Sequence, residues 1–198
     1  MIYFTSDLHL CHDKEFVYKP RGFNSVDEMN NEIVRRWNLV VGKGDTVYVL
    51  GDLMLNDNNK AMELIKTLNG EIHIVLGNHD TDKRAGLYKG LPNVVEVAYA
   101  IKLRHNKMNY FMTHYPCVTG NLQKESLEQM TVNLFGHTHS KELFWEGRPY
   151  MYNVALDAHN CFPVSVDVAR EDMVSEMKKL KNKLKQQVGW IKRLFKIR

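Results

Sequence analysis

Five short polar clusters in this chain carry the residue types that bind divalent metal ions. They are Asp-x-His, Gly-Asp, Gly-Asn-His-Asp, a single His and Gly-His-x-His, and their candidate ligands are Asp7, His9, Asp52, Asn78, His114, His137 and His139. Imidazole nitrogen and carboxylate oxygen suit transition metals, and a bound ion needs several such groups to converge from different segments. A lone histidine is more often a core or surface residue, so the prediction of a metal centre rests on the whole set.

The spacing within the clusters favours joint binding of metal. Side chains alternate along extended backbone, so Asp-x-His and His-x-His would each point two ligands to one face. Asp52 has two carboxylate oxygens and could bridge two ions. Glycine before a ligand allows a sharp turn and a close approach of backbone to the ion. His73 and His105 lie outside the clusters, and we interpret them as structural or solvated.

Each cluster follows an apolar run that predicts a β-strand. The predicted strands are Ile2–Ser6, Thr46–Leu50, Ile72–Leu76, Val94–Leu103, Asn109–Thr113, Val132–Phe135, Tyr150–Ala155 and Val164–Val168. Helical patterns from Ser25 to about Val41, and from Asn58 to Asn69-Gly70, separate the first three strands and imply parallel pairing. Later strands follow closely, as in a mixed or antiparallel sheet. We therefore expect an α/β (α+β) fold, a two-sheet β-sandwich flanked by helices, with ligands at the carboxyl ends of strands.

The bulk composition is that of a globular domain. The chain has 198 residues, 44% hydrophobic and 25% charged, and no apolar run approaches the roughly 20 residues of a membrane-spanning helix. The N-terminus reads as a strand rather than a signal peptide. The three cysteines are odd in number and far apart, which favours a reducing cytoplasm, and Cys11 is interpreted as a small packing residue. A homo-oligomer is left open.

The C-terminal segment differs in charge from the rest. Residues 178–198 carry seven lysines, two arginines and no acid, a charge of +9, so the remainder carries −5 within the net charge of +4. We expect a domain over 1–169 and a basic amphipathic helix over 170–198, whose apolar stripe is Met173, Met177, Leu180, Leu184, Val188, Ile191 and Phe195. Gly189 is expected to loosen or break this helix.

Four uses of this tail stay open at the level of sequence. It could pack on the domain with its lysines solvated, or lie on an anionic membrane surface with Trp190 and Phe195 near its end. It could also bind nucleic acid through phosphates, or form a dimer seam. A membrane contact would make a cytoplasmic protein peripheral to the membrane.

The five clusters, in their order along the chain, resemble the calcineurin-like metallophosphoesterase superfamily. They span Asp7 to His139, about two thirds of the chain, and none lacks a residue. The sequence is most similar to small single-domain bacterial and phage-type members, which begin Ser-Asp-Leu-His and have a second histidine three residues on, here His12. The resemblance implies the superfamily's four-layer arrangement, with the two sheets between helices.

The resemblance also implies roles for the ligands. Asp7, His9 and His139 would hold one ion, Asn78, His114 and His137 would hold the other, and Asp52 would bridge them. His79 would act at the leaving group as a catalytic residue, and Asp80 would orient it. The ions would be two of Mn²⁺, Fe, Zn²⁺, Ni²⁺ or Co²⁺, because mixed nitrogen and oxygen ligands without thiolate suit all of these.

The function implied is hydrolysis of phosphate mono- or diesters by a metal-bridging hydroxide, with a preference for diesters and small nucleotide-like substrates. His12, Arg21 and Arg148 are candidate substrate contacts, and Asp157 and Asp80 are the nearest carboxylates for orienting ligand histidines. Segments Cys11–Asn24 and Tyr115–Gln129 are expected to set specificity. The alternatives are a non-catalytic metal-binding scaffold of the same fold, and a nuclease that holds nucleic acid with the basic tail.

Overall fold

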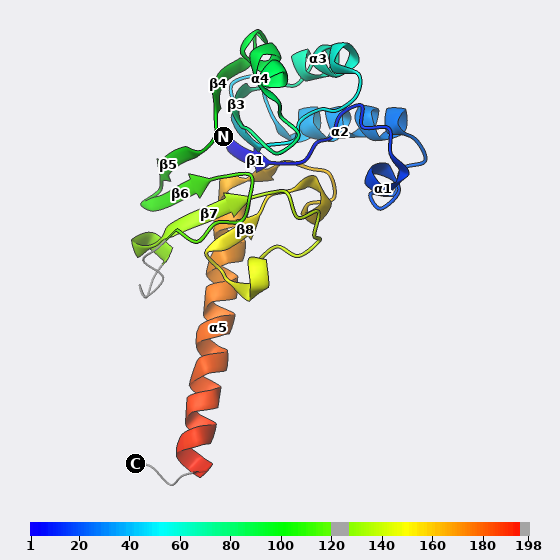
Figure 1. Cartoon of the computed structure of the whole chain (residues 1–198). Helices are drawn as coiled ribbons and strands as arrows, with labels where there is room; N and C mark the ends of the chain where they lie inside the picture. The colour runs from blue at the N-terminus through cyan, green and yellow to red at the C-terminus, as the bar shows by residue number, and fades with distance from the viewer. Residues whose placement is uncertain (120–126, 195–198) are drawn as a thin grey trace.

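The computed structural model describes residues 1–119 and 127–194, with side chains up to residue 187, and it contains two β-sheets (Figure 1). The first sheet has the strand order β4-β3-β2-β1-β9, in which β1 to β4 are parallel and β9 is antiparallel to β1. Its strands are β1 (Ile2–Thr5), β2 (Thr46–Leu50), β3 (Glu71–Val75), β4 (Val94–Ala98) and β9 (Val164–Ser165).

Both faces of the first sheet are buried, because side chains alternate along each strand. In β2, Val47 and Val49 pack under helices, whereas Tyr48 and Leu50 face the second sheet. The helices that precede β9 are α1 (Glu15–Tyr18), α2 (Val26–Val40), α3 (Asn58–Lys66) and α4 (Asp82–Lys89). As expected, Ser25 caps α2, since its side chain accepts a hydrogen bond from the Glu28 N–H.

The second sheet has the order β5-β6-β7-β8 and is mixed. Strand β5 (Ile101–His105) is antiparallel to β6 (Met108–Met112), and β6, β7 (Thr131–Phe135) and β8 (Met151–Asn153) are parallel. Three single-turn helices, η1 (Leu127–Gln129), η2 (Trp145–Gly147) and η3 (Leu156–Ala158), lie in the loops. A core containing Phe4, Tyr110 and Leu134 fills the space between the sheets, which confirms the predicted sandwich flanked by helices.

The single strand predicted over Val94–Leu103 is wrong, because this segment forms two strands in different sheets. Strand β4 pairs with β3 and ends at Ala98, while β5 begins at Ile101 and pairs with β6. Tyr99, at the crossing, is 77% exposed. Residues 97–101 form an unbroken apolar run across the change of sheet, so the pattern alone cannot show where the chain changes sheet.

Helix α5 spans Val166–Leu194 and begins earlier than the expected Arg170. Val166, Ala169 and Met173 are buried in the inter-sheet core, so the expected boundary at residue 170 falls inside a helix that starts within the domain. The break predicted at Gly189 is absent, since the helix continues to Leu194. The predicted contacts of Trp190 and Phe195 lie outside the described side chains.

The C-terminal part of α5 extends away from the body of the protein (Figure 1), and residues 178–187 are exposed. In the part of the chain that the structure describes, no helix combines the length and apolarity that crossing a bilayer requires.

Candidate metal centre

All seven predicted ligands follow strands that end at the same side of the molecule. Asp7 and His9 follow β1, Asp52 follows β2, Asn78 follows β3, His114 follows β6, and His137 and His139 follow β7. The first three strands belong to one sheet and the last two to the other. Parallel strands place their carboxyl ends together, so both sheets deliver ligands to one edge of the sandwich.

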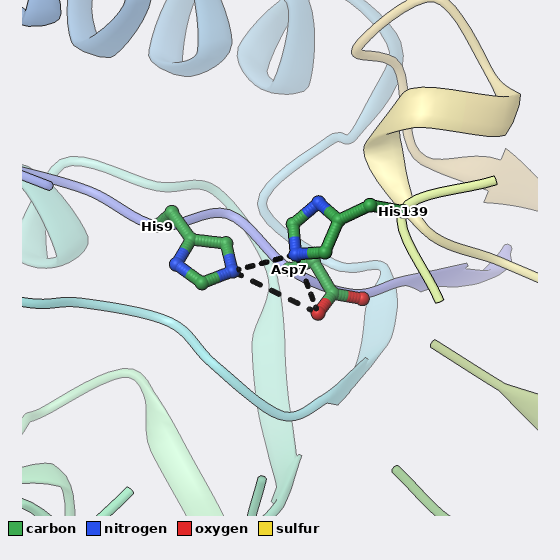
Figure 2. A group of neighbouring side chains, drawn as sticks. All are labelled: Asp7, His9 and His139. Atoms are coloured by element: carbon green, nitrogen blue, oxygen red, sulfur yellow. Dashed lines mark hydrogen bonds and ion pairs between the residues drawn. The ribbon is translucent and has the colours of Figure 1, made fainter. Parts of the chain in front are cut away.

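The first ligand group consists of Asp7, His9 and His139 (Figure 2). The two Nε2 atoms of His9 and His139 lie 3.1 Å apart. Asp7 Oδ1 is 3.9 Å from the Nε2 of His9 and 3.8 Å from that of His139. Three ligand atoms that converge in this way are suited to a single cation.

The second ligand group consists of Asn78, His114 and His137. Asn78 Oδ1 is 2.9 Å from His114 Nε2 and 2.9 Å from His137 Nδ1. Asp52 stands between the two groups, because its Oδ2 is 3.5 Å from His114 Nε2 and 3.9 Å from His9 Nε2. One carboxylate oxygen therefore faces both groups.

Unpaired acceptors in this cluster fit a metal ion. Asp7 is completely buried, yet its Oδ1 has no hydrogen-bond partner among the described residues. His114 donates its Nδ1–H to the Leu50 carbonyl at 2.8 Å, so in the neutral ring Nε2 carries a lone pair. That lone pair faces Asn78 Oδ1, which is also an acceptor. Buried acceptors that face one another are unfavourable unless a cation lies among them.

The histidine that is buried most deeply in the first group is held neutral. Burial, together with the nearby positive charge of Arg21, lowers the pKa of His9 to about 2. Neutral imidazole is the form that binds metal. Burial also raises the pKa of Asp52, a carboxylate that a cation would stabilise.

Left-handed backbone, and not extended backbone, aims most of the ligands. The φ angles are 57° at Asp7, 50° at His9, 55° at Asp52, 68° at His137 and 49° at His139. The expectation that period-two alternation points these pairs to one face is therefore wrong in its geometry. Such conformations cost about 1–3 kcal/mol each outside glycine, and surrounding contacts must enforce them. Sequence carries little signal for this strain.

Glycines make room for the ligands, as predicted. Gly51 has φ +95°, and a Cβ there would collide with His114 Nδ1 and the backbone of Gly77. At Gly136, a Cβ would collide with Ser6 Oγ and Asp7 Oδ2. Any larger residue at these two positions would displace a ligand.

Asp157 fixes the orientation of His139. The sequence suggested this carboxylate for a ligand histidine but did not pair it with one. Asp157 accepts a hydrogen bond of 3.0 Å from His139 Nδ1–H, which leaves Nε2 for the ion. Burial alone would raise the pKa of Asp157, but hydrogen bonds from His139 and Arg21 outweigh burial and lower it. Asp157 therefore stays ionised beside its histidine.

The structure assigns Arg21 a different role from the predicted substrate contact. Its side chain is only 1% exposed, and it donates to both Asp157 oxygens at 3.0 and 2.8 Å and to the Asp7 carbonyl at 2.8 Å. Its donors thus hold Asp157 and the first ligand loop. Arg148 pairs with Glu146 at 2.7 Å and does not line the described cavity.

Asp80 also has a different role from the one predicted. Its Oδ2 accepts from the N–H groups of Asp52 and Gly77 at 2.7 and 2.8 Å, and its Oδ1 accepts from the Tyr88 hydroxyl at 2.7 Å. Asp80 therefore ties together the ligand loops after β2 and β3 and does not orient the ring of His79. The His79 N–H donates to Asp52 Oδ1 at 2.9 Å, so it is Asp52 that positions this residue.

A cavity of ≈ 380 Å³ opens over the ligands. Its described lining is His9, Phe16, Val17, Pro20, Asp52, Asn78, His79, His137, His139 and Asp157. The His79 side chain is 42% exposed in it, with Nε2 4.0 Å from Asp52 Oδ2. His12 is buried and shares a 3.2 Å hydrogen bond between its Nδ1 and that of His9, which places it behind a ligand.

Helix α1 supplies an apolar wall that sequence reasoning did not resolve. Phe16, Val17 and Pro20 line the cavity and lie within the predicted specificity segment Cys11–Asn24. Because α1 has only four residues, its periodicity cannot show which side chains face the site. The second predicted segment brings Tyr115 against His137, with ring centroids 4.5 Å apart. Its residues 120–126 lie outside the described residues.

Comparison with known proteins identifies relatives of this chain. The family model described as the calcineurin-like phosphoesterase superfamily domain matches residues 1–154. An uncharacterized protein of Methanocaldococcus jannaschii is 34% identical over 173 residues, which cover 84% of this chain and 88% of that protein. The gene 66 protein of Mycobacterium phage D29 is 28% identical over 200 residues, covering 89% and 96%. The crystal structure of a protein of unknown function from Aquifex aeolicus has the same fold, with a TM-score of 0.60, 22% identity, and coverage of 83% and 95%.

Replacement of Asp157 by asparagine should weaken metal binding without unfolding the domain. Loss of a carboxylate that orients a ligand histidine typically costs about 10–100-fold in metal affinity. Titration calorimetry with Mn²⁺ and Zn²⁺ measures this change. The matched control is Glu96→Gln, which removes the carboxylate 2.8 Å from His73 Nδ1, outside the site. Equal affinity in the two variants would contradict the role given to Asp157.

Proposed function

The chain belongs to the calcineurin-like phosphoesterase superfamily, and from this premise we propose that it hydrolyses phosphodiesters at a pair of metal ions. The position of Asp52 carries the proposal. Its Oδ2 faces His9 of one ligand group and His114 of the other, at 3.9 and 3.5 Å. A carboxylate that faces both ligand groups is suited to bind two adjacent cations.

The ligand groups divide between the two ions. Asp7, His9 and His139 would hold one, Asn78, His114 and His137 the other, and Asp52 would contact both. When bound, such ions supply a water of lowered pKa and neutralise charge on the phosphoryl oxygens. Nitrogen and oxygen ligands without thiolate suit Mn²⁺, Fe, Zn²⁺, Ni²⁺ and Co²⁺, and availability rather than affinity usually selects among these.

In this proposal His79 would protonate the leaving group. Its backbone is held by Asp52, while its ring remains partly exposed in the cavity. A positioned acid of this kind contributes typically about 10²–10⁴-fold to the rate. The ring of His12 lies beside that of His79, with ring centroids 6.2 Å apart.

The charge of the cavity supports a diester over a monoester. Of the described residues that line it, none is lysine or arginine, while Asp52 and Asp157 are acidic. The bound cations alone would then neutralise the negative charge of the substrate. A diester brings one negative charge, whereas a monoester brings close to two and commonly recruits arginine in addition.

The apolar wall of α1 supports a small substrate with a flat organic group, such as a nucleotide. Phe16 is 73% exposed, and its ring packs edge-on against His12 at 5.7 Å, next to the site. Buried Val17 and Tyr18 anchor the helix that presents it. Exposed aromatic rings at a binding site stack on nucleobases, and the cavity volume of ≈ 380 Å³ suits one small molecule.

Two alternatives make different predictions. A non-catalytic scaffold would keep the fold without turnover, and the complete ligand set argues against it. A nuclease would use the basic tail to hold nucleic acid, and it would act on polymers better than on small diesters.

Metal-dependent turnover tests the proposal directly. Metal-stripped protein should not hydrolyse bis-nitrophenyl phosphate, and activity should return with added Mn²⁺. Asp52→Asn should lower both metal occupancy, measured by elemental analysis, and turnover, because the shared ligand is weakened. Full occupancy with normal turnover in this variant would contradict the bridging role. No turnover by the wild type with any divalent metal would favour the scaffold.

The His79→Ala variant tests proton donation. Activity should fall by about 10²–10⁴-fold on an alkyl diester, whose alkoxide needs a proton, and much less on bis-nitrophenyl phosphate, whose phenolate leaves unaided. Steady-state kcat values on both substrates provide the comparison. An equal loss on the two would argue for an electrostatic role instead.

The Phe16→Ala variant tests the apolar wall. The inhibition constant of adenosine 5′-monophosphate, measured against bis-nitrophenyl phosphate hydrolysis, should rise about tenfold because base stacking is lost. That of ribose 5-phosphate, which has no base, should stay the same. Tyr99→Ala removes a similarly exposed aromatic ring that is not part of the cavity lining, and it serves as control. An unchanged preference for the adenosine compound would refute the stacking role of Phe16.

A further inference from the structure

Helix α5 continues well past the domain that it starts in. Its 29 residues extend about 44 Å at 1.5 Å per residue. The inter-sheet core buries Met173, and Val174 and Met177 pack partly against it. From Lys178 to Gln187 every residue is exposed, so these residues do not pack on the domain, which was one of the four uses that the sequence left open.

The apolar stripe of α5 nevertheless continues into its exposed part. Leu180 and Leu184 are 37% and 50% exposed, and they extend the row of Met173 and Met177 at spacings of three and four residues. An isolated helix gains little from propensity alone, and amphipathic helices are normally stabilised by contact along their apolar face. The stripe is therefore suited to a surface outside the domain.

A hollow of ≈ 340 Å³ lies where this stripe meets the body. Its apolar lining comes from Met108 of β6, Leu127 of η1, and Val174 and Met177 of α5. Its charged lining is Arg170, Lys178, Lys181 and Glu128. Arg170 Nε is buried without a hydrogen-bond partner among the described residues. An apolar hollow edged by cations is complementary to an amphiphile with an anionic head group.

Charge distinguishes among the surfaces that this helix could meet. Residues 178–198 carry +9, and of the five lysines between residues 178 and 187 only Lys179 has an ion pair within the described chain, with Glu176. A second copy aligned along the stripe would bring like charges together. Nucleic acid would pair with the lysines through its phosphates but would not bury the leucines. An anionic bilayer satisfies both.

We propose that α5 and the hollow at its base dock the protein on membranes containing anionic phospholipid. The exposed lysines face the head groups, Leu180 and Leu184 enter the boundary between head groups and acyl chains, and the hollow receives part of one lipid. This attachment is independent of the metal centre. It would place a hydrolase of small phosphate esters at a membrane surface without a spanning segment.

Vesicle co-sedimentation of the full chain tests the proposal. The protein should pellet with vesicles of phosphatidylcholine and phosphatidylserine, not with phosphatidylcholine alone, and less at high salt. Lys178→Glu/Lys181→Glu should reduce binding at least tenfold. Lys43→Glu/Lys89→Glu changes net charge equally at exposed positions elsewhere and should reduce it much less. Equal losses of vesicle binding in the two double variants would show that only net charge matters, and this would overturn the proposal.

Leu184→Asp separates the bilayer from the other partners. This variant should lose vesicle binding while its melting temperature and hydrolysis of bis-nitrophenyl phosphate remain those of the wild type. Unchanged vesicle binding by this variant would overturn the proposal. So would absence of wild-type binding to anionic vesicles. Tight binding of duplex DNA insensitive to Leu184→Asp, or a dimer in light scattering that replaces vesicle binding, would overturn it in favour of nucleic acid or a second copy.

Discussion

The buried carboxylate of Asp7 is the interaction on which the architecture of the site depends. Its Oδ2 accepts a hydrogen bond of 2.8 Å from the His137 N–H and lies 2.6 Å from Ser6 Oγ. Asp7 follows β1 of one sheet and His137 follows β7 of the other, so this group joins the two sheets at their ligand-bearing edge. The other oxygen, Oδ1, has no partner among the described residues and faces His9 and His139. One side chain thus sets the relative position of both halves and supplies a ligand.

The sequence predicted these ligands because chemistry-bearing residue types recur after apolar runs. That signal requires only that strands end where polar residues begin, and parallel strands then bring the ends together. Other features escape it for physical reasons. The change of sheet near Tyr99 lies within an unbroken apolar run, and α1 is too short to show a period. The left-handed backbone at Asp7, His9 and Asp52 arises from tertiary contacts, which no local pattern encodes.

Two polar residues whose roles differ from the predicted ones, Asp80 and Arg21, show a limit of prediction from sequence. The family resemblance implied that Asp80 orients His79, and Arg21 was predicted to contact substrate. Instead, Asp80 binds the amides of Asp52 and Gly77, and Arg21 binds Asp157 and the carbonyl of Asp7. These bonds hold the strained ligand loops in place. A sequence motif records that a charge is needed near the site, but only the structure shows whether it faces substrate or backbone.

Because separate residues hold the ligand loops and rings in place, the site is preorganised. Asp157 fixes the ring of His139, and the Leu50 carbonyl fixes the ring of His114. The carboxylate of Asp52 is held by the hydrogen bond that it accepts from the His79 backbone N–H. The acceptors that remain unpaired among the described residues of the site face one another, so the folded protein bears the cost of their desolvation when no cation is present. A bound cation removes that cost in the folded state alone, since the unfolded chain has no such cluster, and metal binding therefore also stabilises the fold. The cost of these unpaired ligand atoms is tolerable because the binding of a cation would satisfy all of them together.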